Sequence, residues 1–231
     1  MLKISDTAEK SAGENRGKHG LIFLIIALLA FGGLGLEMLL AFLIEPLIYG
    51  VGLNDFNTAQ YIWHWIITCV LWAITAFLIL LFSKRKYGID IFKNKDNIDT
   101  LSWVLCFAFL ILSVVISFID WKGFKPAKEL AYNGWLKFIF QYIYYIFETV
   151  LIYLMIVFGQ KAGEAWFKNK AIPYGGILTA LTWGLIHWFT KGDIIIGLWG
   201  FAMAVMFGAV YLLAKKNIRI AFPFILLMFV L

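Results

Sequence analysis

The sequence predicts an all-α fold, a polytopic bundle of about seven membrane-spanning helices with the N-terminus in the cytoplasm. Of its 231 residues, 62% are hydrophobic and only 15% are charged, whereas soluble domains are about 45–50% apolar and about 25% charged. The apolar residues form runs close to the roughly 20 residues that cross about 30 Å of hydrocarbon. Lys and Arg residues gather in alternate connecting segments, as the positive-inside rule describes.

The spans follow a polar start. Residues 1–20 carry both charge signs, unlike a signal peptide, and are predicted to be a cytoplasmic tail. The apolar run 21–49 is too long for a cleaved signal core, so it is the first predicted span. The other predicted spans are 61–83, 101–119, 135–158, 175–190, 194–214 and 218–231. The last one covers about 21 Å at 1.5 Å per residue, so we expect an abbreviated C-terminal span.

The loops predict the orientation. With the N-terminus inside, the predicted cytoplasmic segments hold 15 of the 20 Lys and Arg residues and the outer segments hold four. The outer loop 120–135 is long enough for a short amphipathic stretch on the surface, with Trp121 and Trp135 as interface anchors. The predicted parts are a tail (1–20), N-terminal transmembrane helices (21–134) and a transmembrane core (135–231).

Composition also excludes some classes. The net charge of +6 comes from basic residues between apolar runs, which indicates orientation in a bilayer rather than nucleic-acid binding. Cys69 and Cys106 lie inside apolar runs, so neither a disulfide framework nor a zinc motif is predicted. No cluster of metal ligands has the usual spacing, so no metal is predicted and the cofactor is unknown. The partner that the composition does predict is the lipid bilayer.

Ionisable residues inside the spans are the informative ones, because a charge at the bilayer centre costs about 2.5–3.5 kcal/mol. Glu45 precedes Pro46 at the exit of the first span; we expect it to reach the interface and do not count it as a site candidate. His64, in YIWHWI beside an outer loop, is interpreted as a structural residue of an interfacial aromatic belt. Glu37 follows GGLG, and both a function and a structural inter-helix hydrogen bond remain open for it.

Glu148 and His187 are the strongest candidates for chemistry. Glu148 lies near the middle of the fourth predicted span, and His187 lies in TALTWGLIHWFTKG of the fifth, about 7 Å nearer the outside by helical rise. A buried carboxyl group beside an imidazole can act as an acid/base pair on water. The same pair can also simply hold two helices together, and both interpretations stay open on the residues alone.

The motifs around these two residues add a resemblance. FETVLIY with Glu148, then Trp183 and His187 in a WxxxH pattern, then the closing FGAVYLLAKKNIRIAFPFILLMFVL resemble the CAAX protease and bacteriocin-processing family (CPBP or Abi), which includes the type II CAAX prenyl endopeptidases. The resemblance covers about residues 135–231. It implies an intramembrane peptide hydrolase of the bacterial plasma membrane. Glu148 and His187 would activate water, Trp183 would support them, and the substrate would be a hydrophobic or prenylated peptide.

The chain departs from this pattern in four places, the second Glu, the arginine, the last histidine and the asparagine after it, whose position the sequence does not reach. The family's first motif is EExxxR, but FETVLIY has one Glu, and neither Ile152 nor Tyr153 can replace the arginine. Met228 stands where the last histidine is expected, and a thioether cannot donate a hydrogen bond to an oxyanion. Losing one such donor costs about 10²–10³ in rate. Tyr145, Tyr153 and Gln160 are the candidate replacements.

Two other classes therefore remain. One is a non-catalytic relative, acting as a bacteriocin-immunity or partner-binding membrane protein. The other is a small transporter that uses Glu37 and Glu148 as a proton relay. The absence of inverted repeats in the sequence argues against the transporter.

Overall fold

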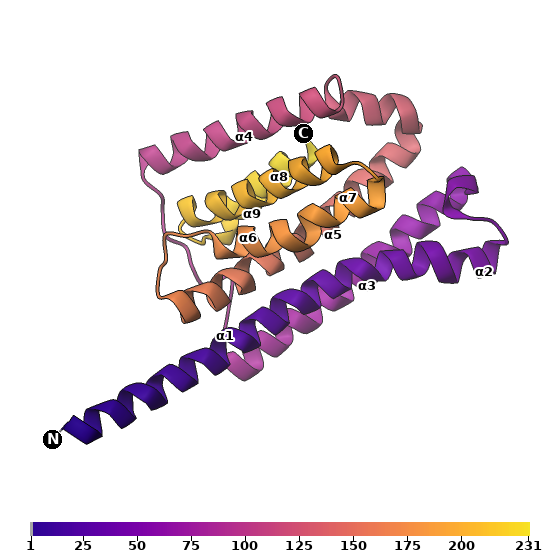
Figure 1. Ribbon diagram of the computed structural model, residues 1–231. Coiled ribbons are helices and arrows are strands. Elements are labelled where there is room, and N and C mark those ends of the chain that lie inside the picture. The colour runs from indigo at the N-terminus through magenta and orange to yellow at the C-terminus, as the bar shows by residue number, and fades with distance from the viewer. Residues whose placement is uncertain (1) are drawn as a thin grey trace.

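The chain forms a bundle of helices (Figure 1), which confirms the predicted all-α class. The computed structural model describes the backbone of residues 2–231 and the side chains of residues 17–231. The helices are α1 (Leu2–Leu39), the π-helical η1 (Leu40–Ile44), α2 (Glu45–Tyr49), the 3₁₀ turn η2 (Leu53–Asp55), α3 (Thr58–Tyr87), α4 (Thr100–Asp120), α5 (Lys125–Phe167), α6 (Tyr174–Thr179), the π-helical η3 (Ala180–Gly184), α7 (Leu185–Lys191), α8 (Ile194–Leu213) and α9 (Ile218–Val230).

Within the part of the chain that the structure describes, five helices are long and apolar enough to cross a membrane. They are Gly17–Tyr49, Thr58–Tyr87, Thr100–Asp120, Lys125–Phe167 and Ile194–Leu213. The predicted span 175–190 is a continuous helical stretch made of α6, η3 and α7, and the predicted span 218–231 is the 13-residue α9. By length and apolarity these two do not count as full spans, so the predicted number of about seven is not confirmed.

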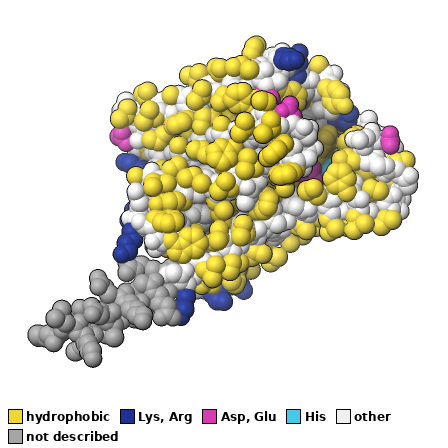
Figure 2. Space-filling view, in the orientation of Figure 1, with side chains coloured by type: hydrophobic (Ala, Val, Ile, Leu, Met, Phe, Trp, Pro, Cys, Tyr) yellow, Lys and Arg dark blue, Asp and Glu magenta, His cyan; other side chains and the backbone are white. Residues whose placement is uncertain are grey.

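The outer surface agrees with a membrane protein. Hydrophobic side chains cover most of the face in Figure 2, and the charged groups lie mainly at its edges. Large apolar side chains such as Leu47 and Phe42 are 80% and 67% exposed. Apolar surface this extensive marks contact with lipid, so the helices are those of an integral membrane protein.

Helix α5 is the centre of the bundle. Helices α1 and α3 lie side by side along it, and α4, α8 and α9 lie on its other side (Figure 1). Every side chain from Leu151 to Phe158 is buried, and a helix that is apolar all round is a buried one. The stretch α6–η3–α7 lies between α5 and α8, so it is held from both sides.

The start of α5 is a separate short helix. Gly134 has φ 67° and ψ 169°, a conformation that glycine adopts readily because it lacks a Cβ. The break divides α5 into a short segment, 125–133, and the long helix that follows. A short helix in this loop was predicted; its position at the outer membrane surface stays a prediction.

The approach of η3 to α8 depends on two glycines. A Cβ added at Gly184 would lie 2.9 Å from the carbonyl of Gly200, so a larger side chain would push the two helices apart. Small residues at helix crossings allow this close packing in membrane proteins. The contact fixes the helix that carries Trp183 and His187.

Candidate functional site

Glu148 is held by an indole. It lies on α5 just before the fully buried segment, and its side chain is partly buried. Trp183, on η3, is 6% exposed, and its Nε1–H donates a hydrogen bond to Glu148 Oε1 at 3.1 Å. Trp183 was predicted to support the site, and it is the residue that orients the carboxyl group.

His187 is held by the same tryptophan. Its Nδ1 lies 2.7 Å from the Trp183 carbonyl oxygen, and the two rings meet edge to face with centroids 4.6 Å apart. A carbonyl oxygen only accepts hydrogen bonds, so we assign the imidazole proton to Nδ1. Nε2 then keeps its lone pair and can accept a proton. Glu148 and His187 share no hydrogen bond within the described part of the chain; Trp183 links them.

Two π-helical segments flank the ionisable groups. Trp183 lies inside η3, and Glu45 directly follows η1. A π-helical turn inserts an extra residue and rotates the side chains that follow, and such turns are frequent at functional sites. This local rotation changes which face of a helix each side chain occupies.

A cavity of about 140 Å³ opens beside Trp183 and His187. It lies between α4, α5, α7, α8 and α9, and most of its lining is apolar or aromatic. Its polar lining residues besides His187 are Ser117, Asp120 and Lys125. Met228 also lines it and is 1% exposed. The cavity therefore surrounds His187 with a mostly apolar wall and three other polar side chains.

The predicted replacement donors are engaged elsewhere. The Tyr145 hydroxyl donates to Glu129 Oε1 at 2.6 Å. Gln160 donates to the Glu164 carboxylate and accepts from the backbone N–H of Gly175. Tyr153 is buried in the core. None of the three predicted donors is among the cavity's lining residues, so none of them compensates for Met228 there.

The prediction for Glu45 was wrong. The side chain is not at a solvated helix end; the residue is 1% exposed, and its Oε2 lies 2.7 Å from His64 Nδ1. The π-helical η1 precedes it and turns it toward α3 instead of outward. The sequence position near the end of a span did not reveal this rotation.

His64 packs inside the protein, because the residue is only 2% exposed; its position at the membrane interface stays a prediction. Its Nε2 lies 3.5 Å from Glu37 Oε1, on the opposite side of the ring from Glu45. His64 thus bridges two carboxyl groups. A signal for this existed: the two glutamates lie eight residues apart in the sequence, and the predicted span 61–83 holds His64 but no Asp, Glu, Lys or Arg.

Glu37 connects this cluster to the first one. Besides its contact with His64, it lies within electrostatic range of Tyr144, Glu148 and His187. Figure 2 shows acidic and histidine side chains deep in a recess on the right of the view. Glu37 therefore makes an inter-helix contact with His64, and whether it also has a function stays open.

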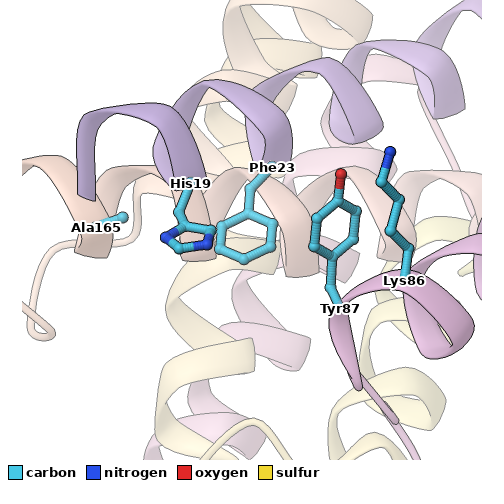
Figure 3. Close-up of a pocket in the computed structure, with 5 residues that line it drawn as sticks. All are labelled: His19, Phe23, Lys86, Tyr87 and Ala165. Carbon is cyan, nitrogen blue, oxygen red and sulfur yellow. The ribbon is translucent and has the colours of Figure 1, made fainter. Parts of the chain in front are cut away.

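A second pocket, of about 570 Å³, lies between α1, α3 and α5 (Figure 3). His19, Phe23, Lys86, Tyr87 and Ala165 line it. Ala165 lies 17 residues beyond Glu148 on the same helix, or about 25 Å at 1.5 Å per residue. This pocket is therefore separate from the region around Glu148.

Over residues 17–231, no group of three or more His, Cys, Asp and Glu side chains is arranged to hold a metal ion. Glu37 and Glu45 face different nitrogens of His64, so these three groups do not converge on one point. The chain matches no known family model, no curated protein and no solved structure.

Proposed function

We propose that this chain is an intramembrane hydrolase of the CPBP type, in which Glu148 and His187 activate water to cut a hydrophobic or prenylated peptide. The observation that carries the proposal is the position of Trp183. Its indole binds Glu148 and its carbonyl accepts from His187, and both Trp183 and His187 line one cavity. The motif pattern of the sequence supports the same assignment.

The proposal includes the membrane topology. The N-terminus lies in the cytoplasm, α6–η3–α7 and α9 complete about seven spans, and the membrane is a bacterial plasma membrane. The support is the distribution of charge, since 15 of the 20 Lys and Arg residues fall in the segments assigned to the inside.

In the proposed reaction His187 Nε2 takes a proton from water while the water oxygen bonds to the peptide carbonyl carbon. The carboxylate of Glu148, oriented by the indole, stabilises the imidazolium that forms. The proton then passes from His187 to the leaving nitrogen as the C–N bond breaks. General acid–base catalysis of this kind contributes about 10²–10⁴ in rate.

The Glu45–His64–Glu37 contacts favour a second function, proton transfer through the membrane domain. An imidazole between two carboxyl groups can receive a proton on one nitrogen and release it from the other. Because Glu37 also interacts with Glu148, a relay would run from Glu45 toward α5. Proton flux into vesicles that Glu37→Gln abolishes would favour this function over hydrolysis.

The hydrolase proposal is tested with the purified protein in lipid vesicles. The substrate is a quenched fluorescent peptide with a hydrophobic C-terminal segment, made with and without a farnesyl thioether. Glu148→Gln and His187→Ala are compared with the matched exposed changes Asp55→Asn and His19→Ala. We expect cleavage by the parent and both controls and a loss of at least 100-fold in the two site variants, with all proteins folded.

The outcomes separate the classes. Cleavage that survives both site changes refutes the assignment of Glu148 and His187. A parent that is folded and cuts neither peptide, while Glu148→Gln and His187→Ala only lower the melting temperature, leaves the non-catalytic, partner-binding alternative.

A further inference from the structure

Lys125 carries a buried ammonium group. It is the first residue of α5 and is 8% exposed. Its Nζ donates a hydrogen bond to the Phe229 carbonyl at 2.6 Å and lies over the rings of Tyr145 and Phe229, 4.9 and 5.1 Å from their centroids. One of its three N–H bonds is therefore used on a carbonyl group, and the rings supply the rest of its surroundings.

No carboxylate of the described side chains lies within ion-pair distance of Lys125. Glu129, one turn along, accepts hydrogen bonds from Tyr142, Tyr145 and Gln141 instead. Glu129, Glu148 and Asp120 interact with Lys125 only at longer range. A buried charge without a direct partner is costly, so the ammonium is well suited to a negative group that enters the site.

The position of Lys125 indicates the kind of negative group that it would bind. It lines the same cavity as Trp183 and His187, and Met228 lines that cavity too. Met228 stands where the sequence pattern expects a hydrogen-bond donor, and its thioether cannot donate. The cavity holds a thioether at Met228 and an ammonium at Lys125.

We infer that Lys125 stabilises the oxyanion formed when water attacks a peptide carbonyl in this cavity. The inference rests on the proposed hydrolase function. As the water oxygen bonds to the carbonyl carbon, the C=O π electrons move onto oxygen, which accepts an N–H hydrogen bond from Lys125. When the C–N bond breaks, the C=O bond re-forms and His187 gives its proton to the leaving nitrogen. One preorganised donor of this kind contributes about 10²–10³ in rate.

A purely structural role for Lys125 would be to bind the end of α9, since its donor satisfies the Phe229 carbonyl. Tyr142 provides a matched control for that role. Its hydroxyl lies 3.4 Å from the carbonyl of Val230 in the same helix end, but it does not line the cavity. Tyr142→Phe removes this contact and the 2.9 Å hydrogen bond to Glu129, but it removes no donor from the cavity lining.

The experiment uses the full chain in vesicles with two probes: a peptide phosphinate, which presents a tetrahedral anion, and the matching amide peptide. Affinity for each is measured for the parent, Lys125→Met, Lys125→Arg and Tyr142→Phe, together with kcat and KM for the amide. We expect the parent to bind the phosphinate at least 100-fold more tightly than the amide. Lys125→Met should lose that preference and lower kcat 10²–10³-fold with KM within threefold.

Lys125→Arg should keep part of both effects because it keeps the charge, and Tyr142→Phe should change neither. A Lys125→Met protein that keeps kcat and the phosphinate preference overturns the inference while the hydrolase proposal stands. If the parent cuts no peptide but prefers the phosphinate, and Lys125→Met lacks that preference, the anion site is supported and the hydrolase function is refuted. If Lys125→Met does not fold, the test is the affinity of the parent protein for the two probes. Equal affinity of the parent for phosphinate and amide overturns the inference.

Discussion

The indole of Trp183 donates a hydrogen bond to Glu148 across 3.1 Å, which joins the central helix α5 to the helix that carries His187. The same residue accepts from His187 through its carbonyl. A single tryptophan thus fixes the positions of both candidate catalytic groups. Its side chain and its backbone have separate effects, and a substitution can separate them.

Replacing Trp183 by Phe removes the indole donor and keeps the carbonyl and an aromatic ring. Glu148 loses a partner, so we expect kcat for peptide cleavage to fall about tenfold and the free energy of unfolding to fall by about 1 kcal/mol. Trp188→Phe on the exposed side of α7 is the control. Equal rates in both variants would show that the hydrogen bond does not position Glu148.

Replacing Glu45 by Ala breaks the buried contact with His64. The imidazole then has a buried nitrogen without its closest partner, and we expect the free energy of unfolding to fall by about 1–3 kcal/mol. Asp55→Ala, an exposed acidic residue on the following turn, should have little effect. Denaturant titration in detergent measures both. An unchanged stability of Glu45→Ala would contradict the pairing.

Replacing Gly184 by Ala adds a Cβ against the Gly200 carbonyl. Overpacking at a tight contact costs about 1–3 kcal/mol, and the shift of α7 should also lower cleavage because His187 moves. Gly32→Ala is the matched control, since nothing lies within 4 Å of its added Cβ. That change should stabilise α1 by up to about 1 kcal/mol. We expect the melting temperature to fall in Gly184→Ala and to rise in Gly32→Ala, each relative to the parent.

Stability at low pH tests the N-cap of α4. The Ser102 side chain donates a hydrogen bond to Asp99, and this lowers the pKa of that carboxyl group below its usual value. A lowered folded-state pKa gives stability that is present above the unfolded pKa, near 4, and is lost as the pH falls through the folded value. Asp99→Asn should match the parent at pH 7, because Asn also caps helices. Between pH 5 and pH 2, Asp99→Asn should lose less stability than the parent. The melting temperature of each protein is measured against pH, and an equal fall in both would refute this prediction.

Much of the fold was predictable from apolar runs and capping residues. Asn57, Asp99, Asp193 and Asn217 each accept a backbone N–H at the start of a helix, and the polar segments that contain them separate the predicted spans. What sequence periodicity could not predict was the number of helices that cross fully. That number depends on the length of α9 and on the π-helical η3 within the α6–α7 stretch.

The site was predictable in part. Glu148, Trp183 and His187 could be selected because their types and spacing are unusual inside apolar runs, and the structure places them together. Glu45 and His64 could not be paired, because their pairing depends on the rotation at η1 and on the packing of α3 against α1. Lys125 was counted as an outer-loop cation. Its burial follows from the break at Gly134 and from the end of α9, which are tertiary features.

The most direct measurement is the cleavage rate of the Glu148→Gln/His187→Ala double variant beside the two single variants in vesicles. Residues that act as one catalytic unit are strongly non-additive. We expect each single change to lower kcat at least 100-fold and the double variant to be no slower than the slower single variant. Single effects that multiply in the double variant, or a single variant that cuts at the parental rate, would contradict this expectation.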